Sequence, residues 1–168
     1  MSTTRWKNRP EGSNWGDFGD DDQLGRINLI TPEKVRQGVA EVQQGRTFCL
    51  SLPLDYPGGN MLNERRHPPH RQPTFLGDKP YINFPLRNID GQNTDVVSDD
   101  QVTICLQYST QWDALSHVGS FFDADGDGVA EKVYYNGFRA GEHVVGPKSW
   151  DGENSDAQLF GAKSLGIE

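Results

Sequence analysis

Apolar positions alternate with polar ones in two segments of the chain, 47–54 and 102–108. Successive side chains of a strand point to opposite faces, so this alternation predicts two strands that each bury one face. The alternating residues are Phe48, Leu50, Leu52 and Leu54 in the first segment and Val102, Ile104, Leu106 and Tyr108 in the second. A third, shorter strand is predicted at 133–135, where a valine precedes two tyrosines.

One segment, 32–44, carries apolar residues at helical spacing instead. Thr31 can cap the first turn and Pro32 suits the first helical position, while Gly45 is a natural end point. The valines at 35, 39 and 42 fall on one face of this helix. A capping-box pattern predicts a second, short helix over 156–165.

The length of 168 residues is enough for a single domain with its own core. With 19 glycines and 10 prolines, much of the chain is expected to form turns. Most of the prolines lie in 55–94, which predicts a long irregular loop of the kind that often serves as a lid or subunit contact. Residues 1–30 are polar with interspersed aromatics, which indicates an ordered N-terminal arm that packs on a larger body.

A formal net charge of -8 disfavours binding to nucleic acid or to anionic lipid. Neither a signal peptide nor a membrane-spanning run is apparent, so a soluble, cytoplasmic protein is expected. The two cysteines, Cys49 and Cys105, each lie in an alternating apolar run, which predicts two buried thiols and no disulfide framework.

The segment from Gln107 to His117 follows the second predicted strand and is the richest in chemistry. Polar side chains at a strand end are well placed to form an active site. Asp113 is a candidate oxygen ligand or general base, and His117 a candidate general acid/base or nitrogen ligand. The alternative is structural: Asp113 caps a helix and His117 is a half-buried histidine.

This segment resembles the signature of the kynurenine formamidase/cyclase family, H-x-G-T-H-x-D-x-P-x-H. Gln107 and Gln111 fall on the first two histidines of the signature, Asp113 on its aspartate and His117 on its last histidine. The version Gln-Trp-Asp-Ala-Leu-x-His at 111–117 is similar to a divergent, cyclase-like branch. Further similar blocks are Asn14-Trp15-Gly16, Asp21-Asp22-Gln23-Leu24-Gly25, Asn28-Leu29-Ile30-Thr31-Pro32-Glu33 and Tyr135-Asn136-Gly137.

The resemblance implies an α/β fold with a mixed, barrel-like β-sheet flanked by helices. It implies a metal-dependent hydrolase of small amides or esters such as arylformamides, in tryptophan catabolism, acting as a homodimer on a small-molecule substrate. A zinc or manganese ion would be held by Asp113, Gln107 and Gln111, although a glutamine carbonyl is a weak ligand. His117 would transfer the proton, and Thr110, Gln111 and Trp112 would contact the substrate. Family chains continue beyond the similar region, so the sequence is expected to be the N-terminal half of a truncated cyclase-like domain.

Two alternatives stay open from the sequence. A family member that has lost its metal and its turnover would act as a binding or scaffold protein. A calcium-binding module would instead use the acidic loop 123–131, whose aspartates at 123, 125 and 127 alternate before glycines. Calcium is disfavoured because Tyr134 stands where an EF-hand loop needs a bidentate glutamate.

Overall fold

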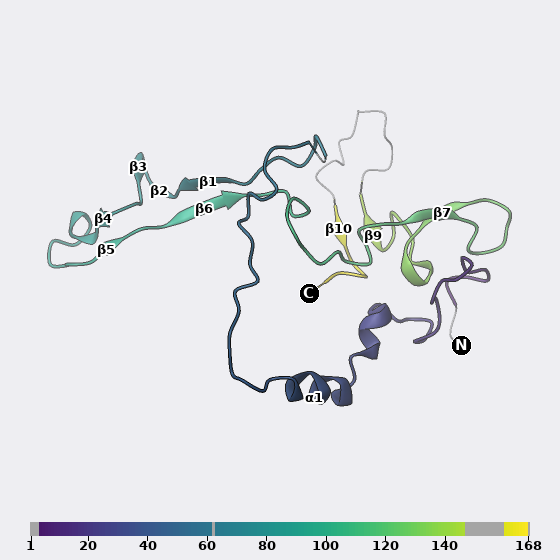
Figure 1. Cartoon of the computed structure of the whole chain (residues 1–168). Coiled ribbons are helices and arrows are strands. Elements are labelled where there is room, and N and C mark those ends of the chain that lie inside the picture. The colour runs from purple at the N-terminus through teal and green to yellow at the C-terminus, as the bar shows by residue number, and fades with distance from the viewer. Residues whose placement is uncertain (1–3, 62, 147–159, 168) are drawn as a thin grey trace, which may run out of the picture. The chain divides into compact units, whose positions relative to one another are not determined.

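The computed structural model describes residues 4–61, 63–146 and 160–167. Its chain divides into two compact units (Figure 1). The first unit comprises Met1–Thr47 and Asp113–Glu168, and the second comprises Phe48–Trp112.

The described residues of the first unit form one α-helix, two short 3-10 helices and two antiparallel strand pairs, β7–β8 and β9–β10. The β7–β8 pair is a hairpin in which Phe121 lies opposite Lys132. The elements are η1 (Gly25–Leu29), α1 (Pro32–Ala40), β7 (Ser120–Phe122), β8 (Glu131–Val133), η3 (Tyr135–Gly137), β9 (Val144–Val145) and β10 (Gly161–Ala162).

The second unit is built from three antiparallel pairs, β1–β6, β2–β3 and β4–β5. The segment 55–94, expected to be an irregular loop, contributes four of these six strands. The elements are β1 (His70–Pro73), β2 (Phe75–Leu76), β3 (Lys79–Pro80), β4 (Phe84–Pro85), η2 (Leu86–Asn88), β5 (Val96–Val97) and β6 (Asp100–Thr103).

The mixture of short strands and a few helices agrees with the predicted combination of α and β structure. The described residues form five separate two-stranded sheets and contain no closed barrel. A strand pair of two to four residues cannot close on itself, because closure needs a continuous ladder of tilted strands. The barrel-like sheet therefore stays a prediction. No helix within the described part of the chain is both long enough and apolar enough to cross a bilayer.

Helix α1 begins where the sequence places it. The Thr31 side chain accepts a hydrogen bond from the Lys34 amide at 3.4 Å, and Pro32 occupies the first turn. The helix ends at Ala40, before the predicted 44, and none of its residues is buried. Val39, on the apolar face, is 66% exposed, so packing does not extend the helix beyond its capped first turns.

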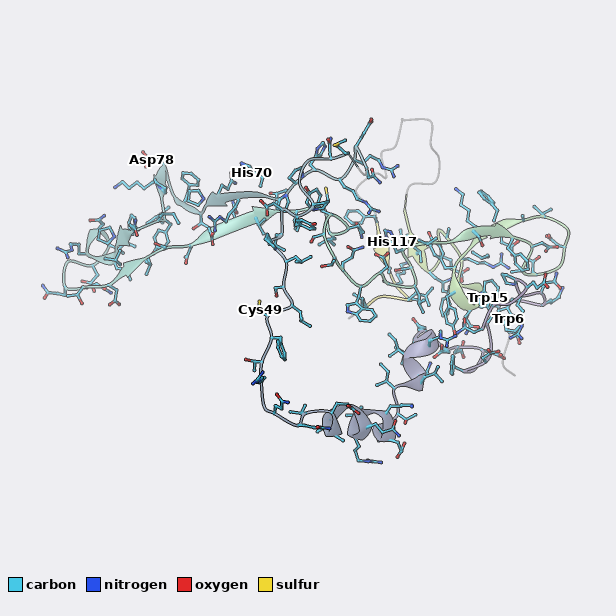
Figure 2. All side chains as sticks on the ribbon, viewed as in Figure 1. Trp6, Trp15, Cys49, His70, Asp78 and His117 are labelled. Atoms are coloured by element: carbon cyan, nitrogen blue, oxygen red, sulfur yellow. The ribbon has the colours of Figure 1, made fainter. Side chains whose placement is uncertain are left out.

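The strand predicted over 47–54 is wrong: no helix or strand lies between Ala40 and His70 among the described residues. Leu50 is 89% exposed and Cys49 is exposed, which also corrects the predicted buried thiol at 49. Alternation indicates a strand only where a neighbouring strand accepts its backbone hydrogen bonds. Figure 2 shows Cys49 on this extended segment.

The other predicted elements form in part. Strand β6 overlaps the predicted 102–108 only at its start and ends at Thr103, while Cys105 is half-buried. Strand β8 ends at Val133, where the sequence places a strand to 135, because Tyr135 begins the turn η3. The helix predicted over 156–165 lies largely outside the described residues. Its described end forms strand β10, since Gly161 and Ala162 pair with β9.

The core of the first unit joins the N-terminal arm to the β7–β8 hairpin. Trp15, Ala124 and Val133 are buried together, with Trp6 and Phe122 packed against them. The Trp15 ring meets those of Trp6 and Phe122 with centroids 6.0 Å apart in each pair. Figure 2 labels the two tryptophans. These aromatic contacts hold the arm against the hairpin.

Asn136 binds the arm at a second point. This residue is fully buried and adopts a left-handed backbone conformation with φ 56°. Its Oδ1 accepts a hydrogen bond from the Gly16 amide at 2.9 Å. Its Nδ2 donates to the carbonyl oxygens of Gly19 at 2.9 Å and of Asp20 and Asp22 at 3.1 Å each. One side chain therefore satisfies four backbone groups of the arm.

A third contact joins the Tyr135 hydroxyl to Asp22 Oδ2 at 2.8 Å. Burial raises the pKa of Asp22, but hydrogen bonds from Asn28, Tyr135 and the Gly25 amide outweigh it and lower that pKa below 3.8. Burial and the Asp22 carboxylate raise the pKa of Tyr135 above 10.0. The neutral phenol and the charged carboxylate therefore stabilise the folded unit together.

We expect Tyr135→Phe to destabilise the first unit by about 1 kcal/mol, because it removes this hydroxyl donor. Because the pKa of Asp22 is depressed, its contribution to stability is present above about pH 3.8. This contribution is lost as the pH falls through the pKa of Asp22 in the folded state. Because the pKa of Tyr135 is raised, its contribution to stability is present below about pH 10.0. This contribution is lost as the pH rises through the pKa of Tyr135 in the folded state. Thermal unfolding of both proteins from pH 3 to pH 11 measures this window.

The difference in stability between the wild type and Tyr135→Phe should therefore be greatest between about pH 3.8 and pH 10.0 and shrink outside this range. Tyr81→Phe is the control, since the Tyr81 hydroxyl makes no hydrogen bond among the described residues and its ring stacks on Phe84. An advantage that does not vary with pH would contradict the proposed coupling.

Candidate functional site

The segment from Gln107 to His117 is divided between the two units, because the boundary falls between Trp112 and Asp113. Gln107, Thr110, Gln111 and Trp112 lie in the second unit, whereas Asp113 and His117 lie in the first. The structure therefore places each group of candidate residues within its own unit.

Gln107 lies at the wall of a small cavity of about 120 Å³ in the second unit. Arg66 Nη1 donates to the Gln107 carbonyl at 2.9 Å, and the Tyr108 hydroxyl donates to the Gly59 carbonyl at 2.8 Å. These bonds fix the start of the candidate segment. Thr110 and Gln111 are exposed, and Trp112 is 86% exposed, so the indole is not a core residue.

In the first unit, Asp113 directly precedes a turn over 114–117 and His117 ends it. The His117 amide donates to the Ala114 carbonyl at 2.9 Å, which closes this turn. The Ser116 amide donates to the Leu165 carbonyl at 3.3 Å. Both the carboxylate and the imidazole are exposed, and Figure 2 marks His117 in the chain leading to β7.

Leu115 fixes the same turn through its side chain. Gly25 has φ +56°, and a Cβ added there would lie 3.4 Å from Leu115 Cδ1 and 3.7 Å from Tyr135 Cζ. The Leu115 and Tyr135 side chains thus pack against Gly25 on the side where another residue would carry its Cβ. On the other side, the buried Leu165 receives the Ser116 bond and donates its own amide to Gln23 at 2.9 Å. The turn that presents Asp113 and His117 is therefore held by the arm and by the C-terminal described segment.

The implied zinc or manganese ion is poorly matched by the donors of this segment. Asp113 offers one carboxylate, whereas Gln107 and Gln111 offer only neutral amide carbonyls. Zinc sites use thiolate, imidazole and carboxylate ligands, and manganese prefers several charged oxygens. The residues present do not make up a divalent transition-metal site.

A different acidic cluster lies in the loop between β7 and β8. Ligand oxygens of Asp123, Asp125 and Glu131 lie within 4.8 Å of one another, a spacing that could hold a metal ion. Two of these carboxylates also order their own loop: Asp123 accepts hydrogen bonds from the amides at 126, 127 and 128, and Asp125 accepts one from the amide at 127. Asp127, outside the cluster, accepts one from the amide at 129. These aspartates act as turn-forming residues.

The guanidinium of Arg139 already lies at this cluster. Its Nη1 is 2.5 Å from Glu131 Oε1, and its Nη2 donates to Asp125 Oδ2 at 3.2 Å. The Arg139 and Glu131 side chains are only 28% and 22% exposed, so the pair is partly screened from water. An internal cation thus pairs with two carboxylates of the acidic loop that the sequence suggested as a calcium site.

The sequence analysis did not name Arg139, and it named Asn136 only within the block Tyr135-Asn136-Gly137, without a structural role. The Asn136-Gly137 dipeptide is a turn signal with a tendency to positive φ, and this signal could have predicted the left-handed turn. No local pattern indicates that Asn136 bonds to residues more than 110 positions away. Similarly, nothing in the sequence around Arg139 indicates its partners.

No protein-family model matches the sequence, and no curated protein matches it. The structure is similar to a solved structure described as the crystal structure of a novel cyclase, with 32% sequence identity and a TM-score of 0.59. The match covers 92% of this chain and 42% of the cyclase chain, so the chain spans less than half the length of that protein. This similarity supports a relationship to the cyclase family.

Proposed function

We propose that the chain carries part of a cyclase-like enzyme that hydrolyses a small amide or ester. The observation that carries the proposal is the similarity to the solved cyclase over 92% of the chain at 32% identity. The motif from Gln107 to His117 adds an imidazole and a carboxylate on one anchored turn. Arylformamides, small aromatic amides of formic acid, are the substrates that the resemblance favours.

In this mechanism, His117 acts as general base and then as general acid. The imidazole takes a proton from water as the water oxygen bonds to the substrate carbonyl carbon. It returns that proton to the amine or alcohol that leaves when the C–N or C–O bond breaks. Asp113 would accept a hydrogen bond from the attacking water.

No step of this mechanism passes through a metal ion, because Asp113, Gln107 and Gln111 are a poor ligand set. A metal requirement would need ligands outside this segment. Elemental analysis of the purified protein tests it directly: about one zinc or manganese per chain, lost in the Asp113→Asn variant, would overturn the metal-free mechanism. If the Asp113→Asn variant keeps the same amount of metal per chain as the wild type, the metal is bound by residues other than Asp113.

We expect His117→Gln to reduce kcat/KM for formanilide or phenyl acetate by about 10²- to 10⁴-fold, the contribution typical of general acid–base catalysis. The glutamine keeps a polar side chain of similar size but cannot transfer a proton at neutral pH. Release of aniline or phenol measures the rate.

His67→Gln is the matched control, since His67 is exposed and belongs to the second unit. It should keep wild-type rates, and both variants should keep wild-type circular dichroism. Equal rates for His117→Gln and the wild type would remove His117 from catalysis.

A second candidate is a binding or scaffold protein without turnover, and it is favoured by glutamine at 107 and 111. The absence of hydrolysis by wild-type protein across formyl, acetyl and lactone substrates would support it over the enzyme. We also propose that the protein acts as a homodimer, which light scattering of the purified protein would test.

A further inference from the structure

One face of the β7–β8 hairpin carries an aromatic ring, a cation and a phenol side by side. Phe121 lies directly opposite Lys132 in the register, and Lys132 Nζ is 6.0 Å from the centre of the Phe121 ring. Tyr134 follows two positions later, so its side chain points to the same side as that of Lys132. Val133 points the other way into the core and is buried.

Gly119 provides the space that Tyr134 occupies. A Cβ at this position would lie 2.7 Å from the Val133 carbonyl oxygen and 3.0 Å from Tyr134 Cε1. Any side chain at 119 would therefore displace the strand or the tyrosine ring. The glycine allows the phenol to lie flat against the start of the hairpin.

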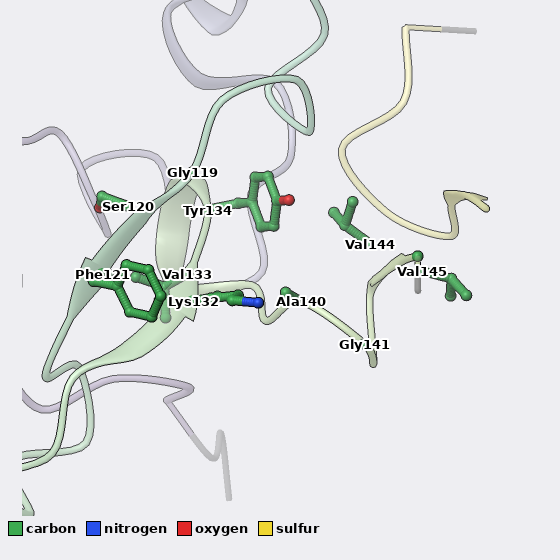
Figure 3. Close-up of a pocket in the computed structure, with 11 residues that line it drawn as sticks. Gly119, Ser120, Phe121, Lys132, Val133, Tyr134, Ala140, Gly141, Val144 and Val145 are labelled. Atoms are coloured by element: carbon green, nitrogen blue, oxygen red, sulfur yellow. The ribbon is translucent and has the colours of Figure 1, made fainter. Parts of the chain in front are cut away.

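Across from this face lie Ala140, Gly141 and the two valines of β9. Together the two sides enclose an open cavity of about 570 Å³. Figure 3 shows the side chain of Lys132 on β8 and that of Tyr134, just after β8, extending toward the side that carries Ala140 and Val144. A volume of this size is typical of sites for small organic molecules.

The charge in this cavity is unbalanced. Lys132 forms no salt bridge with any of the described residues, whereas Arg139 nearby in sequence is engaged by Asp125 and Glu131. The polar side chains that line the cavity are those of Ser120, Lys132 and Tyr134, and their hydroxyl, ammonium and phenol groups can all donate hydrogen bonds to an anion. The remaining walls are apolar or aromatic.

We propose that this cavity binds a small aromatic monocarboxylate. The ligand ring lies between the Phe121 and Tyr134 side and the valines of β9, and its carboxylate pairs with Lys132 and accepts a bond from the Tyr134 hydroxyl. The proposal goes beyond the hydrolase function, because it concerns binding and uses neither Asp113 nor His117.

Titration calorimetry of the full chain with 3-phenylpropionate and with neutral 3-phenylpropanamide tests this binding. At low salt we expect the acid to bind about fivefold more tightly than the amide, the preference expected of one partly exposed ion pair. Lys132→Met should remove this preference and leave the amide affinity unchanged. Phe121→Ala should weaken both ligands.

Lys34→Met is the control, because Lys34 is an exposed lysine of α1 outside the cavity. It should keep the preference for the acid. Equal affinity of wild-type protein for acid and amide, no binding of either, or a preference that survives Lys132→Met would each overturn the proposal. Since the measurement is of binding, its outcome does not depend on whether the protein hydrolyses any substrate.

Discussion

Replacing Asn136 with alanine is expected to lower the free energy of unfolding of the first unit by about 3 kcal/mol. The substitution removes the Asn136 bonds to the Gly16 amide and to the carbonyls of Gly19, Asp20 and Asp22. The Gly19 carbonyl keeps the Asp22 amide as a donor and the Asp20 carbonyl keeps Arg5, so the Gly16 amide and the Asp22 carbonyl carry most of the loss. An unpaired buried polar group costs about 1–3 kcal/mol, and part of this cost is recovered where water reaches the arm. Urea unfolding followed by tryptophan fluorescence measures the loss, since Trp6 and Trp15 lie in the affected core.

Two further variants separate the side chain of Asn136 from its backbone conformation. Asn83 has a similar φ of 50° but is exposed, so Asn83→Ala should cost only about 1 kcal/mol, the penalty of a left-handed alanine. Glycine adopts a left-handed conformation without this penalty. The Asn136→Gly variant should nevertheless remain more than 1 kcal/mol less stable than the wild type, because it still lacks the side-chain hydrogen bonds. Faster hydrogen exchange at the Gly16 amide is the local sign of the lost bond. A glycine variant as stable as the wild type would show that the four bonds contribute little.

Replacing Arg139 with glutamine is expected to destabilise the first unit by about 2 kcal/mol and to make its stability respond to calcium. The change leaves Asp123, Asp125 and Glu131 facing one another without a cation. With a dissociation constant of about 1 mM, 10 mM calcium would restore about 1.4 kcal/mol. Thermal unfolding with and without calcium chloride measures both effects.

The wild-type protein should show no such calcium response, because the guanidinium holds the position of the ion. Choline chloride at equal ionic strength controls for screening, and Arg71→Gln controls for loss of an exposed ion pair with Asp100. Calcium stabilising the wild type as strongly as the variant would instead favour a calcium-binding module.

Local signals in the sequence predicted the start of α1 well. Thr31 and Pro32 act within one turn, so their capping does not depend on the rest of the fold. The aspartates of the acidic loop also act locally, since they bond to amides two to five residues away. Features that act over such short distances can be inferred from a single sequence.

The strand at 47–54 failed for the opposite reason. The alternation of Phe48 and Leu50 is real, but a strand also requires a partner, and no described segment pairs with it. Likewise, the candidate chemistry at Gln107 and Asp113 was found by pattern, whereas the division between two units at Trp112 depends on contacts far along the chain. The bonds of Asn136 to the arm and of Arg139 to Glu131 belong to the same class. Tertiary partners decide these features, and local sequence does not encode them.

The position of Arg139 beside the acidic loop gives the hairpin a counterion that is covalently part of the chain. A bound metal would leave whenever its free concentration fell below its dissociation constant. A tethered guanidinium has no such threshold, since the backbone fixes its effective concentration. The loop between β7 and β8 should thus keep the same conformation in chelator-treated and in ion-rich solutions, whatever the supply of divalent cations around the protein.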